Sequence, residues 1–390
     1  MDESNRIINV KMIKVVHTVH AFTAESGGTS TCTYDLLTAL NNTDIQANVI
    51  VTTPRKKEVP LMGHEENWII SVENDEKTPF AISVHLRNAL EQTNADIYHT
   101  NGLWRYCNHV AATTARKKGK PYVITPHGML YPQALTRSQW QKRLLRKVFF
   151  DKDLQEAACI HVTCEDEMRH VRALGFTNPI AVIANPVPMP HMCFPKRKGN
   201  VKFGYLGRLH PRKHIERIIE ALTLLSREEQ AQCELVLMGS GDTAYELRLH
   251  QLVEQSGLNN VQFTGFVSGQ EKEEQLAGLS ALFVPSDFEN FGLIVAEALA
   301  CGTPVFASTG TPWNILTERE CGWWQEPTAE NMAKVMRQIL VMFPENIDEM
   351  GKKGRLLVEE SFSAERVAQQ MAALYQWIVT GKSKPSFVYE

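Results

Sequence analysis

The sequence predicts an α/β protein with two domains, each a parallel sheet covered by helices on both faces. Short apolar runs alternate with helical patterns through the first half of the chain, and the alternation restarts near residue 200. Such alternation is typical of β-α-β units, whose strands are parallel. A chain of 390 residues is also long enough for two separate hydrophobic cores.

Composition narrows the class of protein further. The net charge of −3 provides no basic field for nucleic acid, so no nucleic-acid partner is expected. The eight cysteines include no Cys-x-x-Cys pair, and we interpret them as reduced core residues. No apolar run is long enough for a transmembrane helix, and the N-terminal segment MDESNRIINVKMIK is too polar for a signal peptide. We therefore expect a cytoplasmic protein.

The first domain is expected over residues 1–184. Its apolar runs predict strands at Met12–Val19, Ala47–Thr52, Asp96–His99, Tyr122–Thr125, Cys159–Thr163 and Ile180–Ile183. Helical patterns fall between them, as at Tyr34–Leu40, Pro79–Gln92 and His109–Lys117. The two periodicities, near 2 and near 3.6 residues, separate the strands from the helices.

A Pro-rich, basic segment at 185–199 is expected to link the domains. The second domain is expected over 200–361, and a final segment, 362–390, carries the helical pattern Ser363–Ile378. Predicted strands of the second domain are Lys202–Leu206, Glu234–Met238, Val261–Thr264, Ala281–Pro285 and Pro304–Ala307. The helix Ile215–Leu225 follows the first of them.

Four loops of the second domain follow predicted strand ends: 207–213, 239–242, 265–267 and 286–293. In an open parallel sheet such loops meet at one edge, where ligands bind. We predict that Gly239, Gly241, Phe266 and Val267 line a nucleotide crevice there.

Arg208 and Lys213 are the cations that suit a diphosphate in this crevice. Arg provides a planar fork of donors and Lys a mobile point charge. None of the four loops contains an Asp-x-Asp motif that would hold a metal ion beside a diphosphate. We therefore expect neither a metal ion nor a cofactor.

The segment Ser286–Gly302 carries the most informative pattern. Glu289 and Asn290 lie on a turn, a helix is predicted over Phe291–Cys301, and Gly302 and Pro304 end it. The backbone N–H groups of Phe291, Gly292 and Leu293 would form a positive helix terminus that suits phosphate.

Glu289 and Glu297 lie eight residues apart, which corresponds to roughly 12 Å along a helix. A glycosidase needs its two carboxylates about 5–9.5 Å apart. The pair therefore indicates two contacts with one long polar ligand. A solvated helix start is the alternative for the glutamates alone, and the intervening Asn-Phe-Gly favours a site.

This segment resembles the E-x7-E signature of retaining, nucleotide-sugar-dependent glycosyltransferases of family 4, which have two facing Rossmann-like domains (the GT-B fold). The resemblance covers nearly the whole chain and includes the spacing GRxxxxK at Gly207–Lys213. It implies that Glu289 holds donor-sugar hydroxyls, that Glu297 holds the ribose, and that the last helix crosses back to the first domain. His214 stands where the family often has Gly, which is expected to alter only how the following helix begins, and Pro186 replaces another Gly.

In the first domain the predicted site residues lie at strand ends. Gly27 and Gly28 open the first helix and match the family's Gly-rich loop near the diphosphate, although a plain turn is an equal reading of the pair alone. His127 matches a position that contacts the donor sugar near its reacting carbon in the family. Asn101, Trp104 and Tyr131 are predicted to contact the acceptor, and Trp104 has the alternative of packing beneath its loop.

The segment Leu103–Lys152 holds eleven Lys or Arg and one acid, Asp151. Within it, Arg137–Phe150 predicts a basic amphipathic helix with Trp140, Phe149 and Phe150. Such helices lie on anionic membrane surfaces, and the alternative is a solvated face of a core helix.

Together these features predict a retaining, metal-independent glycosyltransferase. It would move a sugar from a nucleotide diphosphate sugar, UDP-linked in preference to GDP-linked, to a hydroxyl of a lipid-linked glycan. The segments at Gly310–Leu316 and Cys321–Trp324 resemble enzymes of bacterial surface polysaccharide synthesis, including capsule, which places it at the inner face of the membrane. The alternatives are a nucleotide-sugar epimerase of the same fold and a non-catalytic sugar-binding protein.

Overall fold

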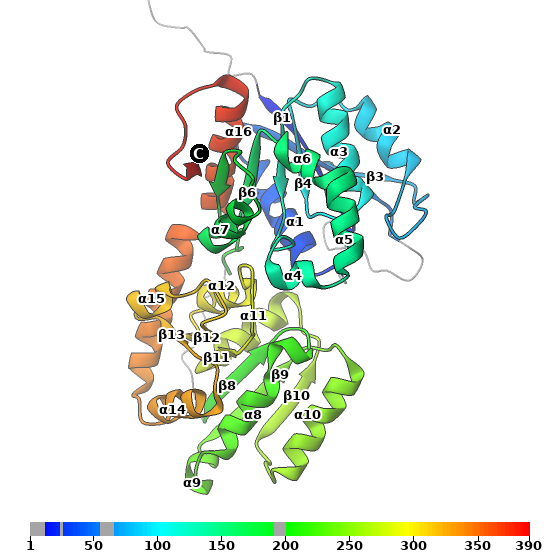
Figure 1. Ribbon diagram of the computed structural model, residues 1–390. Coiled ribbons are helices and arrows are strands. Elements are labelled where there is room, and N and C mark those ends of the chain that lie inside the picture. The colour runs from blue at the N-terminus through cyan, green and yellow to red at the C-terminus, as the bar shows by residue number, and fades with distance from the viewer. Residues whose placement is uncertain (1–11, 24–25, 55–65, 191–199) are drawn as a thin grey trace, which may run out of the picture. The chain divides into compact units, whose positions relative to one another are not determined.

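The computed structural model describes residues 12–23, 26–54, 66–190 and 200–390, and the chain divides into two compact units (Figure 1). Unit 1 comprises residues up to Pro186 together with Val367–Glu390, and unit 2 comprises Val187–Arg366. The predicted ends at 184 and 361 lie within a few residues of the observed bounds, whereas unit 2 begins at Val187, within the predicted linker, rather than at 200. Most of the predicted linker lies at 191–199, outside the described residues.

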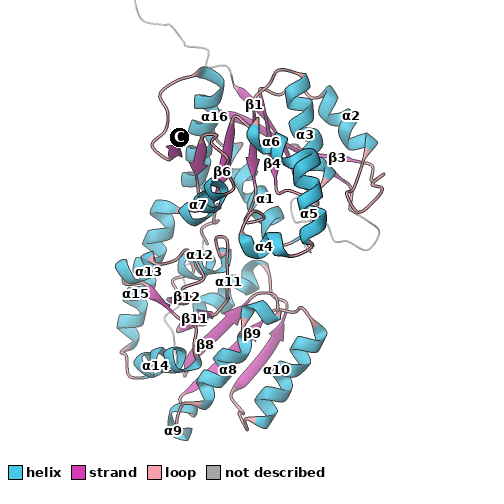
Figure 2. Ribbon diagram, viewed as in Figure 1, coloured by secondary structure: helices cyan, strands magenta, loops and turns pink. Residues whose placement is uncertain are grey.

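Unit 1 is built on one sheet with the strand order β14-β7-β6-β5-β4-β1-β2-β3 (Figure 2). Its strands are β1 (Ile13–Thr18), β2 (Ile45–Thr52), β3 (Ile69–Val72), β4 (Ile97–Asn101), β5 (Tyr122–Thr125), β6 (Cys159–Val162), β7 (Ile180–Val182) and β14 (Val388–Tyr389). All pair in parallel except β14, which pairs antiparallel with β7. The short edge strands β3 and β14 were not predicted, because each is too short for a readable alternation.

The helices of unit 1 alternate with these strands along the sequence, as predicted. They are α1 (Gly28–Leu40), α2 (Val84–Gln92), α3 (Tyr106–Lys117), α4 (Pro132–Thr136), α5 (Gln139–Leu145), the π-helix η2 (Arg146–Phe150), α6 (Asp151–Gln155), α7 (Glu165–Ala173) and α16 (Ala364–Thr380). Alternate strand residues face two cores: α1 and α16 cover one face of the sheet, and α2, α3, α6 and α7 cover the other. The predicted return of the last helix to the first domain is confirmed, since α16 packs in unit 1 from Val367 onward.

Unit 2 has a parallel sheet with the strand order β10-β9-β8-β11-β12-β13. Its strands are β8 (Val201–Leu206), β9 (Cys233–Met238), β10 (Val261–Gly265), β11 (Ala281–Val284), β12 (Val305–Ser308) and β13 (Gly322–Gln325). Its helices are the 3-10 turn η3 (Pro211–Lys213), α8 (Ile215–Thr223), α9 (Arg227–Gln230), α10 (Thr243–Gln255), α11 (Gly269–Gly278), α12 (Leu293–Ala300), α13 (Ile315–Glu318), α14 (Ala329–Leu340) and α15 (Pro344–Ser361). The two parallel α/β domains predicted from the sequence are therefore confirmed.

In the described part of the chain, no helix has both the length and the apolar character that crossing a membrane requires. Seven cysteines of the described residues are free thiols, and all except Cys164 are buried. Burial raises the pKa of Cys107 and Cys159 to about 12, so these thiols pack as small apolar groups.

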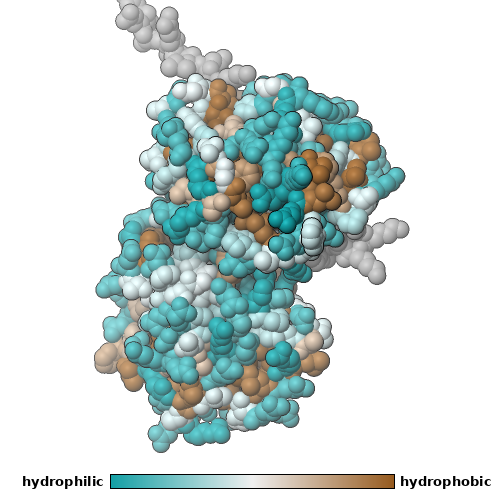
Figure 3. Space-filling view, viewed as in Figure 1, coloured by the Kyte–Doolittle hydropathy of each residue, from teal (hydrophilic) through white to brown (hydrophobic). Residues whose placement is uncertain are grey.

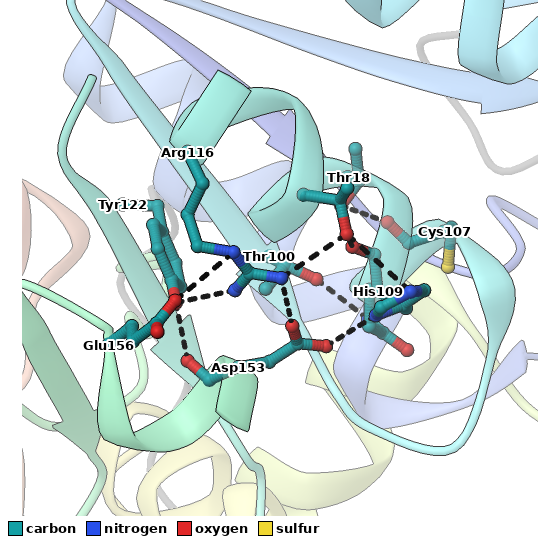
Figure 4. A network of polar contacts seen from close by, with 10 residues as sticks. Thr18, Thr100, Cys107, His109, Arg116, Tyr122, Asp153 and Glu156 are labelled. Carbon is teal, nitrogen blue, oxygen red and sulfur yellow. Dashed lines mark hydrogen bonds and ion pairs between the residues drawn. The ribbon is translucent and has the colours of Figure 1, made fainter. Parts of the chain in front are cut away.

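A buried polar network holds α3 and α6 of unit 1 together (Figure 4). The carboxylate of Asp153 is almost fully buried and lies 2.7 Å from both Arg116 Nη2 and His109 Nδ1. The hydroxyl of Tyr122 donates to the backbone oxygen of Asp153 at 2.7 Å. Removing one partner of a buried ion pair leaves the others desolvated without compensation.

We expect Asp153→Asn to lower the free energy of unfolding by about 3–5 kcal/mol, because Arg116 would lose its buried counter-charge. Glu156→Gln is the matched control, since Glu156 contacts the same arginine at 3.3 Å but is 45% exposed. An exposed pair of this kind contributes about 0–1 kcal/mol. Denaturant unfolding of the three proteins measures both values, and equal losses would contradict the assignment.

Candidate functional site

Three loops at the carboxyl edge of the sheet in unit 2 are joined by backbone hydrogen bonds. Gly207 N donates to Met238 O at 3.0 Å, Leu209 N to Ser240 O at 3.1 Å, and Gly239 N to Gly265 O at 2.7 Å. A Cβ atom on Gly239 would lie 1.9 Å from Gly207 O, and one on Gly241 would lie 2.2 Å from Leu209 O. Glycine at both positions therefore permits the close packing that gives this edge its shape.

Lys213 and Glu289 meet at this edge. The ammonium of Lys213, at the end of η3, forms an ion pair with the carboxylate of Glu289, and both side chains are mostly buried. The backbone N–H of Glu289 donates to Gly310 O at 3.1 Å, which holds the turn in place. Arg208 is exposed, and no ion pair joins its side chain to a described residue. The sequence-predicted cations thus lie at the same strand ends, one of them already paired with a predicted site carboxylate.

The helix after this turn begins later than predicted. It runs from Leu293 rather than Phe291, with Gly292 in the left-handed conformation at φ 77° as its N-cap. The ring of Phe291 is buried against Trp313 and Phe362, and Trp313 Nε1 donates to Phe291 O at 2.5 Å. The ring of Phe291 therefore packs inside unit 2 and positions the N-terminus of α12, whereas the contact of its backbone N–H with phosphate stays a prediction, now from a residue that precedes the N-cap.

Glu297, on α12, pairs with Lys272 of α11 at 3.0 Å. Lys272 has no sequence signal of its own, because it stands among glutamates in a helix without a motif. Both side chains are about one quarter exposed. This lysine is thus a further charged group beside the predicted site.

His214 occupies a left-handed backbone position, at φ 50°. This conformation explains a glycine preference there, since it strains residues with a side chain. The imidazole lies 3.0 Å from Glu216 Oε1 and 2.6 Å from Asp287 Oδ2. The departure therefore does more than alter how α8 begins, because it links α8 to the loop that carries Glu289.

The remaining predicted residues of unit 2 divide by exposure. Phe266 is 69% exposed, whereas Val267 is 6% exposed and packs inward. The predicted ligand contact of the Val267 side chain is therefore corrected to a core role. Asn290 is half-buried in the turn between Glu289 and α12.

In unit 1, His127 and Asn101 come together at the carboxyl ends of β5 and β4. His127 Nε2 lies 3.4 Å from Asn101 Oδ1, and both residues line a small cavity with Thr33, His161 and Asn185. His127 has a left-handed backbone, at φ 50°. Gly27 is the N-cap of α1 at φ 74° and Gly28 is its first residue, as the sequence indicated.

Two predicted acceptor residues pack within unit 1. Tyr131 is 1% exposed, its ring packs on His170 at 4.4 Å, and its hydroxyl lies 3.5 Å from Cys164 Sγ. Trp104 packs edge-on against Phe150, with Lys142 Nζ 5.7 Å from its ring centre. The structure thus favours packing over acceptor contact for both side chains.

A hollow that was not predicted from the sequence lies at the ends of β1 and β2. The described residues that line it include Thr53, Asn74, Glu76 and Arg105. Thr52 Oγ1 donates to Glu76 Oε1 at 2.9 Å. These residues share no sequence motif because they come from separate segments, and Asn74 and Glu76 follow β3, a strand that was not predicted.

The basic segment forms α5 followed by the π-helix η2, and its exposed apolar residues differ from the prediction. Phe150 is fully buried, and Phe149 stacks on Phe80 with ring centroids 5.5 Å apart. The exposed apolar residues are Trp140, Leu144 and Val148, which are 81%, 64% and 54% exposed. Figure 3 shows apolar surface beside hydrophilic surface where Figure 1 labels α5.

The carboxylates of the Asp-x-Asp sequence in unit 1 are already paired with arginines. The Asp-x-Asp sequence at Asp151–Asp153 lies in unit 1, where Asp153 is engaged by Arg116 and Asp151 Oδ1 pairs with Arg146 Nε at 2.8 Å. Across the described residues, no cluster of three or more His, Cys, Asp or Glu side chains has the arrangement of a metal site.

Three histidines are buried beneath His127 in unit 1. Burial lowers the pKa of His17 to about 3 and that of His161 to about 4, and it lowers the pKa of His99 well below its usual value. Burial also lowers the pKa of His127 to about 3, with a smaller effect from His161. All four imidazoles are therefore neutral near pH 7.

Two family models match the chain, one in each half. Residues 194–356 match the model described as glycosyl transferases group 1, and residues 27–186 match the glycosyl transferase 4-like domain. Together these matches cover most of both units.

Similar curated proteins carry related names. The chain is 24% identical over 303 residues to the MMP alpha-(1->4)-mannosyltransferase of Mycolicibacterium hassiacum, covering 72% of this chain and 70% of that protein. It is 31% identical over 170 residues to the GDP-mannose-dependent alpha-(1-6)-phosphatidylinositol dimannoside mannosyltransferase of Mycobacterium tuberculosis, covering 43% of this chain and 42% of that protein. An uncharacterized glycosyltransferase of Methanocaldococcus jannaschii is 31% identical over 44% of each chain. The matched region thus spans less than half the length of two of these three relatives.

Solved structures share the fold over nearly the full length. Anabaena HepE in complex with UDP-glucose has a TM-score of 0.73 at 19% identity, covering 93% of this chain and 99% of that one. Sucrose-phosphate synthase from Thermosynechococcus elongatus has a TM-score of 0.75 at 20% identity, covering 95% and 100%.

The buried histidines should make unit 1 sensitive to acid. An unfolded histidine binds a proton below about pH 6.5, whereas His17, His99 and His161 resist protonation until far lower pH. The unfolded state therefore binds more protons, and stability should fall as pH drops from about 6.5 toward 4, by about 1.4 kcal/mol per pH unit for each histidine.

Denaturant unfolding between pH 7 and pH 5 measures this slope. His161→Asn should reduce the slope, whereas His250→Asn, which alters an exposed histidine of unit 2, should leave it unchanged. A stability that does not vary across this range would show that the three histidines are not protected from protonation.

Proposed function

Because the chain belongs to family 4 of the glycosyltransferases and has the GT-B fold, we propose that it transfers a sugar, with retention, from a nucleotide diphosphate sugar to a hydroxyl of a glycan. The observation that carries this proposal is the ion pair of Lys213 with Glu289 at the carboxyl edge of the sheet in unit 2, with the exposed Arg208 two residues after the end of β8 at the same edge. Cations and a helix N-terminus suit the diphosphate, and the carboxylates suit hydroxyl groups.

The proposed reaction places negative charge on the leaving group. The bond between the anomeric carbon and the β-phosphate oxygen breaks, and the sugar becomes oxocarbenium-like. The acceptor oxygen then bonds to the same face of that carbon, and its proton passes to the departing phosphate oxygen. Arg208, Lys213 and the N-terminus of α12 would stabilise the diphosphate without a metal ion.

The ion pair of Lys213 with Glu289 bears on how the donor binds. In the free protein each charge satisfies the other. An incoming diphosphate attracts the ammonium, which releases the Glu289 carboxylate to accept hydrogen bonds from sugar hydroxyls. We thus propose that binding of the diphosphate and of the sugar are coupled through this pair.

We propose the donor and the acceptor by their chemical class. UDP-sugars are the first donors to test and GDP-sugars the second, the latter supported by the name of the M. tuberculosis relative. The proposed acceptor is a lipid-linked glycan of surface polysaccharide synthesis, in the cytoplasm at the inner face of the membrane. The exposed Trp140, Leu144 and Val148 beside Arg143 and Lys147 support contact with anionic lipid.

A two-step experiment tests the function. Thermal shift with UDP, GDP and their sugar conjugates identifies the donor, because a ligand at 100 times its Kd stabilises by about 2.7 kcal/mol. Transfer to glycan acceptors is then measured with EDTA and with Mn²⁺, and we expect EDTA to have no effect. Donor epimerisation without acceptor would instead indicate the epimerase, and binding without any turnover would indicate a sugar-binding protein.

We expect Arg208→Ala and Lys213→Ala each to lower kcat more than they raise KM. The charge that these side chains meet is greatest in the transition state, and one such contact is worth about 2.7–4 kcal/mol, or about 10²–10³-fold in kcat. Lys202→Ala is the matched control, since Lys202 is a partly exposed lysine of β8 paired with Glu234 at 3.4 Å. Near-normal kcat in both variants would exclude them from the diphosphate site.

We expect the protein to sediment with anionic vesicles at low salt and less at high salt. Each Lys or Arg near such a surface contributes about 1 kcal/mol. Trp140→Ala combined with Arg143→Gln and Lys147→Gln should abolish sedimentation, whereas Phe343→Ala, which removes a 73% exposed aromatic ring from unit 2, should not. Failure of the unmodified protein to bind at low salt would leave the helix a purely structural element.

A further inference from the structure

A continuous chain of hydrogen bonds runs under His127 in unit 1. It crosses four neighbouring strands, β6, β5, β4 and β1, with one side chain from each: His161, Thr125, His99 and His17. Tyr375 of α16 joins the last two, with its hydroxyl 2.6 Å from His99 Nδ1 and 3.0 Å from His17 Nε2. These five side chains are all buried.

At the His161 end of this hydrogen-bond chain, the structure determines which atoms donate and which accept. His161 Nε2 lies 2.8 Å from Ile183 O, and a carbonyl oxygen can only accept. A neutral His161 therefore carries its proton on Nε2 and accepts at Nδ1 from Thr125 Oγ1, which is 2.8 Å away. The Thr125 hydroxyl donates its only proton in that bond, so it accepts from His99 Nε2 at 2.6 Å.

The directions of the remaining hydrogen bonds, from His99 to Asn101, follow in the same way. His99 Nδ1 is an acceptor, so Tyr375 donates to it and accepts from His17 Nε2. His17 Nδ1 is left to accept from Asn101 Nδ2 at 3.3 Å. The orientation of that amide is confirmed independently, because the same nitrogen lies 3.3 Å from Thr18 O.

Asn101 therefore turns its oxygen toward His127. The Oδ1 atom lies 3.4 Å from His127 Nε2, and an amide oxygen can only accept. A proton on His127 Nε2 is thus the arrangement that satisfies every group along the chain. All four histidines are neutral because burial lowers the pKa of each.

We propose that this hydrogen-bond chain holds His127 in the tautomer protonated at Nε2, so that its Nδ1 lone pair is available to accept a hydrogen bond from a ligand hydroxyl. Thr125, His99, His161, His17 and Tyr375 are then positioning residues, since they act through Asn101 and His127. The identification of the hydroxyl as that of a sugar rests on the proposed function, whereas the tautomer does not.

The chemical consequence concerns charge. An oxocarbenium-like sugar carries positive charge, so a protonated imidazole beside it would raise the barrier. A neutral imidazole with an acceptor nitrogen can orient a sugar hydroxyl without that penalty. Burial thus keeps His127 neutral, and the hydrogen-bond chain determines which of its nitrogens accepts.

The tautomer is measured directly on the free protein by long-range ¹H–¹⁵N NMR with ¹⁵N-labelled histidine. The His127 signals are identified as those lost in His127→Gln. We expect a pyrrole-type Nε2 and a pyridine-type Nδ1, unchanged from pH 8 to pH 5. A proton on Nδ1, or two protonated nitrogens at pH 6, overturns the proposal.

Substitutions of residues in the hydrogen-bond chain test whether these bonds determine the tautomer of His127. Thr125→Val keeps the shape but removes both hydrogen bonds, and Thr125→Ser restores them, so the first should mix the tautomers of His127 and the second should not. Tyr375→Phe should act like Thr125→Val. Tyr98→Phe is the matched control, since it also removes a buried hydroxyl of unit 1, one that contacts Leu90 O and Thr93 O.

Activity provides the second readout once a donor is known. Thr125→Val and Tyr375→Phe should lower kcat about 3- to 10-fold, the value of one neutral hydrogen bond, with a smaller change in KM. A pure Nε2–H tautomer in Thr125→Val would overturn the positioning role even if activity fell. An Nε2–H tautomer in a protein without transferase activity would instead leave this inference standing and contradict the proposed function.

Discussion

The parallel pairing of strands is the constraint on which the candidate site depends. Parallel strands all end at one edge of a sheet, so loops from distant parts of the sequence meet there. In unit 2 this edge gathers Arg208, Lys213 and Glu289, and in unit 1 it gathers Asn101 and His127. The backbone bonds between the loops then fix how closely these side chains approach.

Glycine makes that approach possible in several places. Side chains on Gly239, Gly241 or Gly310 would collide with the backbone of a neighbouring loop, and one on Gly292 would crowd Trp313. The tryptophan in turn holds the carbonyl before α12, which sets where the helix begins. The close approach of Trp313 to Gly292 therefore also determines where the positive N-terminus of α12 lies.

Charges in the two units are satisfied in different ways. The carboxylates of unit 2 pair with lysines that remain partly exposed, so a polar ligand can displace these contacts. The histidines of unit 1 are instead kept neutral by burial and joined by directional hydrogen bonds. The two units therefore differ in kind: charged groups that a ligand can displace lie in unit 2, and neutral groups with fixed hydrogen-bond directions lie in unit 1.

The sequence by itself determined the two α/β domains, most of the strands, and the candidate residues that follow strand ends, because periodicity and local motifs are properties of neighbouring residues. The tertiary structure decided which of these side chains are available. It buried Tyr131, Phe291 and Val267, and it paired Glu297 with Lys272. It also packed Phe149 and Phe150 inward while leaving Trp140 exposed. It also assembled the histidine chain, whose members lie up to 358 positions apart. Pairing and burial depend on contacts between distant segments, which no local pattern encodes.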